Sequence, residues 1–262
     1  MLVNLLMNQS VGSNYTSNSQ KIREISESWA ASEVFCPACG GDLERSRNNS
    51  SVLDFLCRNC PEEYELKSKA GEFSRKVMDG AFDSMMSRIA IPNSPHFFFL
   101  GYDRTRYEVN NLFVVPSYFF QPVAIEKRKP LAPTARRAGW VGCNILLDQI
   151  PDAGKIHYIR NGNEAPHDSV LGAWRKTAFL AELTPLESRG WTLDVLSCIE
   201  KIAQAEFSLD EIYRFEGELS KRHPKNNFVK DKIRQQLQVL RDKDYLEFVA
   251  RGKYRLTPSN AT

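Results

Sequence analysis

Two short cysteine pairs constrain this chain more than any other feature. Each pair has the spacing C-x-x-C, and 17 residues separate the first pair from the second. The pairs are Cys36 with Cys39 and Cys57 with Cys60. Two such knuckles place four thiolates around a tetrahedral Zn²⁺ and leave no open position for water. The spacing predicts a structural zinc ribbon over about 34–62.

A redox dithiol is the alternative interpretation of either pair, but dithiol chemistry does not need a second matched pair. The chain has only six cysteines in 262 residues, too few for a disulfide scaffold. We expect the other two, Cys143 and Cys198, to be small buried hydrophobic residues.

The length favours one large domain with one small one. No apolar run reaches the roughly 20 residues that a membrane-spanning helix needs. The first residues are briefly apolar but lack the basic patch and cleavage site of a secretory signal, so we expect a cytoplasmic protein.

Residues 1–183 mix helical and extended patterns. Apolar residues recur at helical spacing over 19–32 and over 74–89, whereas short apolar runs at 52–56 and 64–68 indicate strands. Three further runs read as strands of a core sheet: 96–101, 111–115 and 155–159. This order predicts an α/β or α+β domain that contains the ribbon.

The pattern of apolar residues changes after a segment rich in Pro, Ser and Gly at 184–190. Three helical patterns follow, at 193–205, 209–221 and 228–243, and two alternating runs then predict a β-hairpin. Ser208 stands three residues before Glu211, which is the start of a capping box. Three helices followed by a two-stranded wing predict a winged-helix domain over 184–262.

Acidic residues near the second cysteine pair suggest a catalytic site. If 64–68 is a strand, Glu65 and Lys67 point to the same face, and a hairpin partner carrying Asp54 brings a second carboxylate beside Glu65. Two adjacent carboxylates repel each other, and Mg²⁺ relieves that repulsion. Acidic residues are common, so a solvated strand face explains the same spacing.

The order of these pieces resembles the PD-(D/E)xK nucleases. The resemblance is closer still to the adenine-methylation-dependent type II restriction endonucleases among them, and it covers essentially the whole chain. Its most specific stretch runs over 131–144, Leu131-Ala-Pro-Thr-Ala-Arg-Arg-Ala-Gly-Trp-Val-Gly-Cys-Asn144. Leu53 stands where the proline that gives the family its name would be, a position at which the chemistry does not require proline.

The resemblance implies Mg²⁺-dependent hydrolysis of double-stranded DNA at GATC sites with N6-methyladenine, with both domains binding the methylated site. It implies that Asp54 and Glu65 bind the metal ion, that the Leu66 carbonyl is a further ligand, and that Lys67 supports the nucleophile. It also implies 5′-phosphate and 3′-hydroxyl ends. We expect a monomer without membrane contact.

Basic residues gather in two regions that suit a DNA backbone. Residues 127–137 hold five basic and no acidic residues, and prolines there argue against a helix; residues 221–255 hold 11 basic and 4 acidic residues. A solvated loop is the alternative for the first region. Trp140 offers an apolar wall for a methyl group or belongs to the core, and Trp191 has a weaker claim of the same kind. The candidate DNA contacts are Lys127, Arg128, Lys129, Arg136, Arg137, Trp140, Lys230, Lys232, Arg234, Arg251 and Lys253.

A protein of another class fits the two recognisable modules. A zinc ribbon and a winged helix both occur in transcriptional regulators that bind DNA without cutting it. That alternative leaves the core of about 100 residues after the ribbon without a function, and it does not explain why Glu65 and Lys67 share a strand face.

Overall fold

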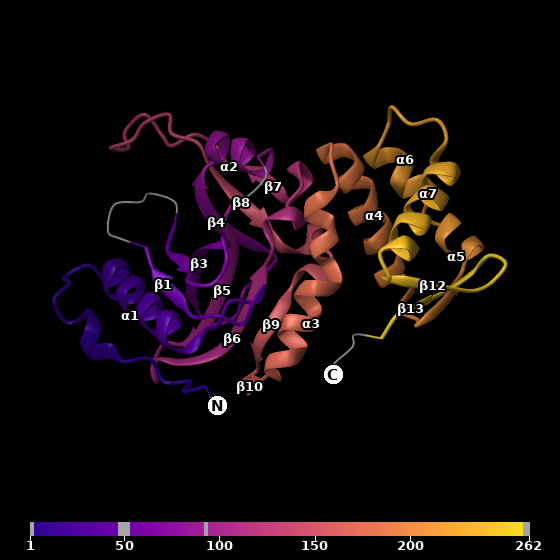
Figure 1. Ribbon diagram of the computed structural model, residues 1–262. Coiled ribbons are helices and arrows are strands. Elements are labelled where there is room, and N and C mark those ends of the chain that lie inside the picture. Colours follow the sequence, from indigo (N-terminus) through magenta and orange to yellow (C-terminus); the bar gives the residue numbers. More distant parts are fainter. Residues whose placement is uncertain (1–2, 47–52, 92–93, 259–262) are drawn as a thin grey trace.

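The computed structural model describes residues 3–46, 53–91 and 94–258. A mixed sheet of seven strands forms its centre (Figure 1). In spatial order the strands are β1 (Leu43–Arg45), β2 (Phe55–Cys57), β3 (Glu63–Ala70), β5 (His96–Asp103), β6 (Glu108–Val115), β9 (Ile156–Arg160) and β10 (Asn163–Glu164). β3 and β5 run parallel, and the other neighbouring strands run antiparallel. The strands expected at 64–68, 96–101, 111–115 and 155–159 are therefore confirmed. Residue 52 of the run at 52–56 lies outside the described residues, and β2 begins at Phe55.

Successive side chains of β5 enter two separate cores, because side chains alternate along a strand. Phe98 and Leu100 pack beneath α1 (Asn18–Glu33) and α3 (His167–Thr177), together with Trp29 and Trp174. Phe97 and Phe99 pack on the opposite face. This second face carries the candidate catalytic residues.

A second, smaller sheet covers part of that face. Its strands are β4 (Lys76–Ala81), β8 (Gly142–Leu146) and β7 (Ile125–Lys127), all antiparallel, and α2 (Phe82–Ile89) follows β4 directly. The expectation of one helix over 74–89 is therefore wrong in its first half. Val77 is buried and pairs with Ile145 of β8, so backbone hydrogen bonds to a distant strand decide the conformation here. Helical spacing begins only at Phe82.

The C-terminal part is a winged helix. Its elements are α4 (Leu186–Ile202), β11 (Glu206–Ser208), α5 (Leu209–Tyr213), α6 (Glu216–Arg222), α7 (Val229–Asp242), β12 (Leu246–Ala250) and β13 (Lys253–Leu256). Ser208 and Glu211 form the expected capping box, but the helix expected at 209–221 is divided into α5 and α6. The wing gains a third strand, in the order β11-β13-β12.

Short 3-10 helices occupy several connections. They are η1 (Gln9–Gly12), η2 (Ser117–Phe119), η3 (Pro122–Ala124), η4 (Leu147–Gln149), η5 (Asp152–Gly154) and η6 (Ala178–Glu182). No helix in the described ranges is long and apolar enough to cross a membrane.

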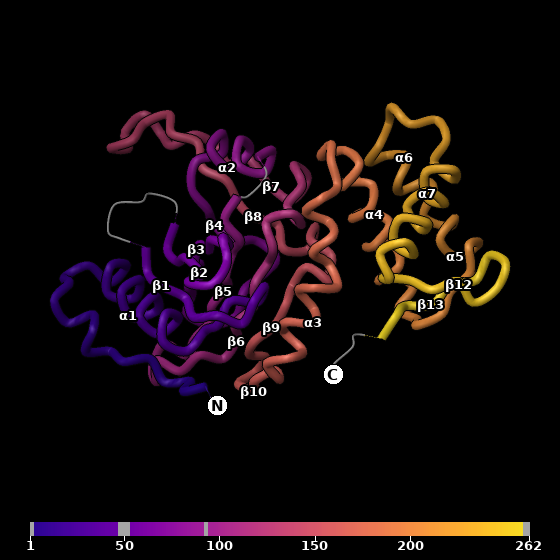
Figure 2. Tube along the Cα trace, in the orientation of Figure 1, coloured from indigo at the N-terminus to yellow at the C-terminus, as the bar shows by residue number. Residues whose placement is uncertain are grey.

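The two parts of the chain share one hydrophobic core. Phe120, Ile150 and Leu180 belong to the same buried cluster as Trp191 and Ile199 of α4, and the trace in Figure 2 shows α4 lying against the sheet-bearing part. Trp191 is 1% exposed and stacks on His223 at 3.8 Å between ring centroids. Of the two interpretations of Trp191, methyl contact or core, the structure supports the core, because this indole fills the interior.

Polar bonds reinforce the same junction. The carboxylate of Glu200 accepts hydrogen bonds from the backbone N–H groups of Asp152 and Ala153, both at 2.8 Å. Arg222 donates to Gln149 at 3.1 Å. The winged helix is thus fixed against the sheet through packing and through hydrogen bonds.

Candidate functional site

The four cysteines converge as their spacing predicts. Their sulfur atoms all lie within 4.8 Å of one another, with Cys36 and Cys60 at 3.6 Å and Cys39 and Cys57 at 3.4 Å. Four thiolates about 2.3 Å from a tetrahedral zinc ion would be about 3.8 Å apart, so this donor set fits the metal. Gly40 turns the first knuckle with φ +77°, a left-handed conformation that favours glycine.

The cysteine cluster is coupled to the strand that follows it. The Tyr64 hydroxyl lies 3.0 Å from the Cys36 sulfur, and its ring is fully buried. Tyr64 directly precedes Glu65 in β3. The ribbon therefore fixes the start of the strand that carries the candidate catalytic residues.

Glu65 and Lys67 lie on one face of β3, as the strand alternation predicts. The ammonium of Lys67 contacts the carboxylates of both Glu65 and Asp79. Arg88 of α2 donates to the other oxygen of Glu65 at 2.9 Å. All four side chains are mostly buried, with exposed fractions from 4% for Asp79 to 20% for Arg88.

Asp54 reaches the same strand from the residue before β2. Its Oδ2 accepts a hydrogen bond from the backbone N–H of Leu66 at 2.8 Å, and its Oδ1 accepts one from Arg23 at 3.0 Å. Burial raises the pKa of Asp54, and the negative charges of Glu27 and Glu65 add to that rise. The carboxylate of Asp54 is therefore close enough to Glu65 for the two charges to repel.

Lys67 stays charged in this setting. Burial by itself works to lower the pKa of the Lys67 ammonium, but the adjacent carboxylates of Glu65 and Asp79 outweigh it and the net pKa is raised. A protonated lysine beside two carboxylates is a group that can orient a water molecule and offset negative charge on a phosphate.

Comparison with protein families decides where this chain belongs. The model of the Dam-replacing family, DpnI, matches residues 3–183, and the model of the Dam-replacing HTH domain matches residues 187–256. The chain belongs to the DpnI family. It is thus a member of a restriction endonuclease family and carries a DNA-binding winged helix, which confirms the resemblance and the fold class expected from the sequence.

The acidic cluster of this DpnI-family chain has the ligands of a hard divalent cation. Asp54 and Glu65 could supply carboxylate oxygens, and Leu66, whose backbone N–H bonds to Asp54, directly follows Glu65 in β3. Mg²⁺ prefers such oxygen ligands, and positive charge would relieve the repulsion that Glu65 exerts on Asp54. The residues present therefore fit Mg²⁺.

Sequence reasoning missed several members of this cluster. Asp79, Arg88, Arg23 and Glu27 all contact the candidate catalytic residues or each other. Asp79 lies on the same face of β4 as the buried Val77, and Met78 between them is exposed, so a period of two was the available signal. The prediction of one helix over 74–89 left this strand period unrecognised.

The basic loop of this DpnI-family chain leaves the smaller sheet between β7 and β8. Lys127 lies at the end of β7, with its ammonium 5.0 Å from the centroid of the Phe82 ring. Arg137 stacks over Trp140 at 4.7 Å, and Trp140 is half-buried. Arg128 is half-buried, whereas Lys129, Arg136 and Arg137 are exposed. Trp140 thus has one face covered by a guanidinium at the base of a projecting loop.

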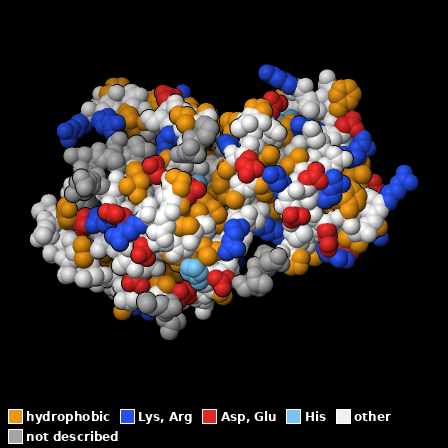
Figure 3. Space-filling view, viewed as in Figure 1, with side chains coloured by type: hydrophobic (Ala, Val, Ile, Leu, Met, Phe, Trp, Pro, Cys, Tyr) orange, Lys and Arg blue, Asp and Glu red, His pale blue; other side chains and the backbone are white. Residues whose placement is uncertain are grey.

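The candidate contacts in the winged helix lie on α7 and on the turn of the wing. Lys230 and Arg234 of α7 are exposed but already paired, with Glu216 and Asp231. Lys232 is half-buried and donates to Gln235. Arg251 and Lys253 are exposed and form no ion pair with any residue that the structure describes. On the face drawn in Figure 3, blue side chains project at the loop on the upper left and at the wing on the right.

Proposed function

We propose that this protein cleaves double-stranded DNA at GATC sites whose adenine is N6-methylated, by Mg²⁺-dependent hydrolysis of the phosphodiester. The observation that carries the proposal is the buried cluster in which Asp54 bonds to the backbone of the strand holding Glu65 and Lys67. Membership of the DpnI family supports it. The methylated base and the GATC site come from the family resemblance.

In this proposal Asp54, Glu65 and the Leu66 carbonyl hold Mg²⁺. The ion, when bound, polarises a phosphate oxygen and lowers the pKa of a coordinated water. Lys67 holds the attacking water and offsets the charge that develops on the phosphate, giving 5′-phosphate and 3′-hydroxyl ends.

Asp79 positions Lys67 for this task. Its carboxylate is almost wholly buried and contacts the Lys67 ammonium from the second sheet. When the Glu65 carboxylate binds a cation, Asp79 remains as the acidic partner that holds Lys67 in place. Burial of a carboxylate without such a partner would cost several kcal/mol.

We propose two DNA-reading domains, 1–183 and 184–262, within a monomer. The loop at 127–137 with Trp140 serves the first, and α7 with the wing serves the second. Apolar burial of one methyl group is worth about 0.8 kcal/mol, or about fourfold in affinity. A pocket shaped around the group discriminates by about 1–3 kcal/mol, or about 10- to 200-fold. Two domains that each read a methylated adenine multiply their preferences.

The test compares two plasmid preparations that differ only in adenine methylation, each incubated with the protein with and without Mg²⁺. We expect fragments only from methylated plasmid with Mg²⁺. Binding without cleavage under all four conditions would instead support the transcriptional regulator, the other class of protein that carries a zinc ribbon and a winged helix.

A further inference from the structure

A small cavity lies beside the catalytic cluster, where the winged helix meets the sheet. Its volume is about 80 Å³, room for several water molecules or for one tetrahedral anion. Arg88 of α2, Ser94, Ser117 and Arg189 of α4 are among its lining residues. The cavity therefore receives one guanidinium from each part of the chain.

Both guanidinium groups have a donor without a partner among the residues that the structure describes. These donors are the buried Nε atoms of Arg88 and Arg189. Arg189 makes one long bond, from a terminal nitrogen to the carbonyl of Ile89 at 3.4 Å, and pairs with no carboxylate in the described ranges. Partial burial lowers the pKa of Arg189. A half-buried positive charge with an unpaired donor is stabilised by an anion.

Glu62, the acidic side chain that lines the cavity, is already hydrogen-bonded to His96. The Ser117 backbone N–H donates to Nδ1 of His96 at 2.8 Å, so Nε2 of His96 carries the proton and donates to Glu62 at 2.6 Å. Glu62 is thereby directed toward His96. It does not supply the missing partner of Arg189.

We propose that this cavity binds a phosphate group of the DNA substrate, next to the phosphodiester that is cut. Arg88 also donates to Glu65, so a phosphate held by Arg88 and Arg189 would lie beside the proposed metal site. The inference rests on the proposed nuclease function and adds a contact to it. It also gives the winged helix, through Arg189, a direct role at the catalytic centre.

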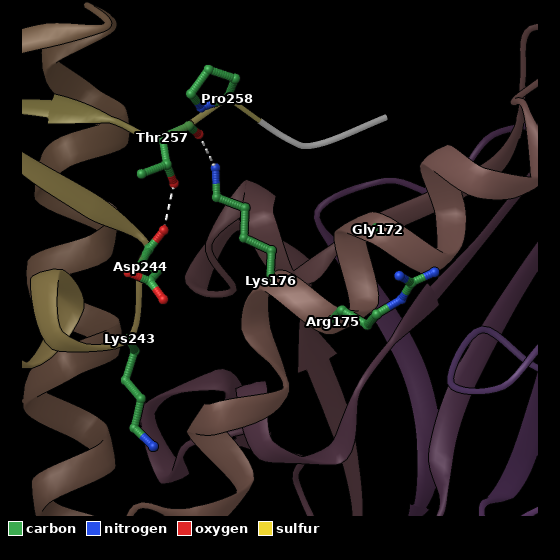
Figure 4. A pocket seen from close by; sticks show the side chains of 7 residues that line it. All are labelled: Gly172, Arg175, Lys176, Lys243, Asp244, Thr257 and Pro258. Carbon is green, nitrogen blue, oxygen red and sulfur yellow. Dashed lines mark hydrogen bonds between the residues drawn. The ribbon is translucent and has the colours of Figure 1, made fainter. Parts of the chain in front are cut away.

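A larger cleft offers the main competing anion site. It has a volume of about 530 Å³ and is lined by Arg175, Lys176 and Lys243 (Figure 4). Lys176 already donates to the Thr257 carbonyl at 2.5 Å, and Lys243 pairs with Glu182 at 2.9 Å. In Figure 4 the side chain of Arg175 extends away from those of the two lysines. The cations of this cleft do not converge.

The first experiment titrates inorganic phosphate into the full-length, zinc-loaded protein without Mg²⁺, by calorimetry at constant ionic strength. We expect saturable binding that Arg189→Gln weakens at least tenfold. Arg175→Gln, the matched control in the other cleft, should leave the affinity within twofold of wild type. No saturable binding, or a loss in Arg175→Gln instead of Arg189→Gln, would overturn the proposal.

A second variant tests the proposal independently, in case Arg189→Gln does not fold. Ala181 is an exposed residue that lines the cavity, so Ala181→Glu offers Arg189 an internal carboxylate without removing any contact. We expect Ala181→Glu to abolish phosphate binding with an unchanged melting temperature. Retention of wild-type phosphate affinity in this variant would contradict the assignment.

A DNA-binding experiment distinguishes binding of a DNA backbone phosphate from binding of a free phosphate ion. Without Mg²⁺, Arg189→Gln should weaken binding of a methylated GATC duplex and lower the slope of log Kd against log salt by about 0.9. Unchanged DNA affinity and slope, beside lost phosphate binding, would refute a DNA contact at this cavity. A protein that binds DNA through Arg189 but cuts no plasmid would refute the nuclease and leave the cavity assignment standing.

Discussion

The carboxylate of Asp54 illustrates how single residues reach the proposed catalytic centre. Its side chain is 11% exposed and is held by the Leu66 N–H and by Arg23. Arg23 is itself 65% exposed, so this contact adds little stability. The position of Asp54 therefore suits binding of an ion more than it suits stabilisation of the fold.

Replacement of Asp54 tests this role. Asp54→Ala should lower the cleavage rate by about a thousandfold or more, because a charged ligand worth several kcal/mol is lost from the metal site. Affinity for methylated DNA should stay within about threefold of wild type, measured without Mg²⁺. The control is Asp83→Ala, an exposed acidic residue of α2. Cleavage by Asp54→Ala at the wild-type rate would mean that another carboxylate holds the ion.

His157 of β9 should make stability depend on pH. Burial lowers its pKa to about 4, with Arg160 and Lys155 adding to the effect, and Phe113 lies against its ring. The unfolded chain has a histidine pKa of about 6.5, so it binds the proton first as pH falls. Stability should therefore decline between about pH 6.5 and 4, by up to about 1.4 kcal/mol per pH unit from this group.

The measurement is the free energy of unfolding in urea at several pH values, for wild type and His157→Gln. The variant keeps a neutral polar side chain, so the difference between the two curves isolates the histidine. We expect a shallower decline in His157→Gln. Parallel curves across the whole window would show that His157 has the same pKa in the folded and the unfolded protein.

At the scale of elements, the zinc ribbon and β3 form one unit. β1 pairs with β2, β2 pairs with β3, and Tyr64 links β3 to the Cys36 sulfur. Such small hairpins bury little surface and depend on a metal for their conformation. Loss of the metal should therefore disturb the candidate catalytic residues of β3.

Cys57→Ser tests this dependence. We expect loss of bound zinc, lower solubility and a lower melting temperature, because three thiolates no longer close the tetrahedron. The control is Cys198→Ala, a buried cysteine outside the ribbon, which should keep one zinc per chain. Metal content by atomic absorption and melting by calorimetry distinguish the two. Full zinc content in Cys57→Ser would argue against a four-cysteine site.

At the scale of the whole molecule, the shared core determines how the two parts work together. Phe120, Leu180 and Trp191 are buried in one cluster. Removal of residues 184–262 would expose this surface, so truncation would test folding as much as DNA binding. Variants of exposed residues are the cleaner probe of the winged helix.

Two basic residues of the wing, Arg251 and Lys253, are exposed and form no ion pair within the described part of the chain. We expect the double variant Arg251→Ala, Lys253→Ala to bind methylated DNA more weakly and to lower the salt slope of log Kd by about 1.8, since each phosphate contact contributes about 0.9. The control is Arg104→Ala, Arg106→Ala, in the turn between β5 and β6. An unchanged salt slope in the wing variant would remove Arg251 and Lys253 from the proposed interface.

The sequence by itself determined the features that depend on local spacing. The cysteine pairs, the capping box at Ser208 and the hairpin of β12 and β13 involve residues close along the chain, so local spacing predicts them. The shared face of Glu65 and Lys67 follows from strand alternation in the same way.

Only the tertiary structure decided which distant residues complete these features. Asp79 contacts Lys67 because β4 pairs with β8. Arg189 lines the same cavity as Arg88 because α4 packs into the core of the sheet. Those contacts join elements far apart in sequence through backbone pairing and side-chain packing. Local periodicity does not indicate which strand or helix will be the partner. Such neighbours can therefore be identified only from the packed structure of the whole chain.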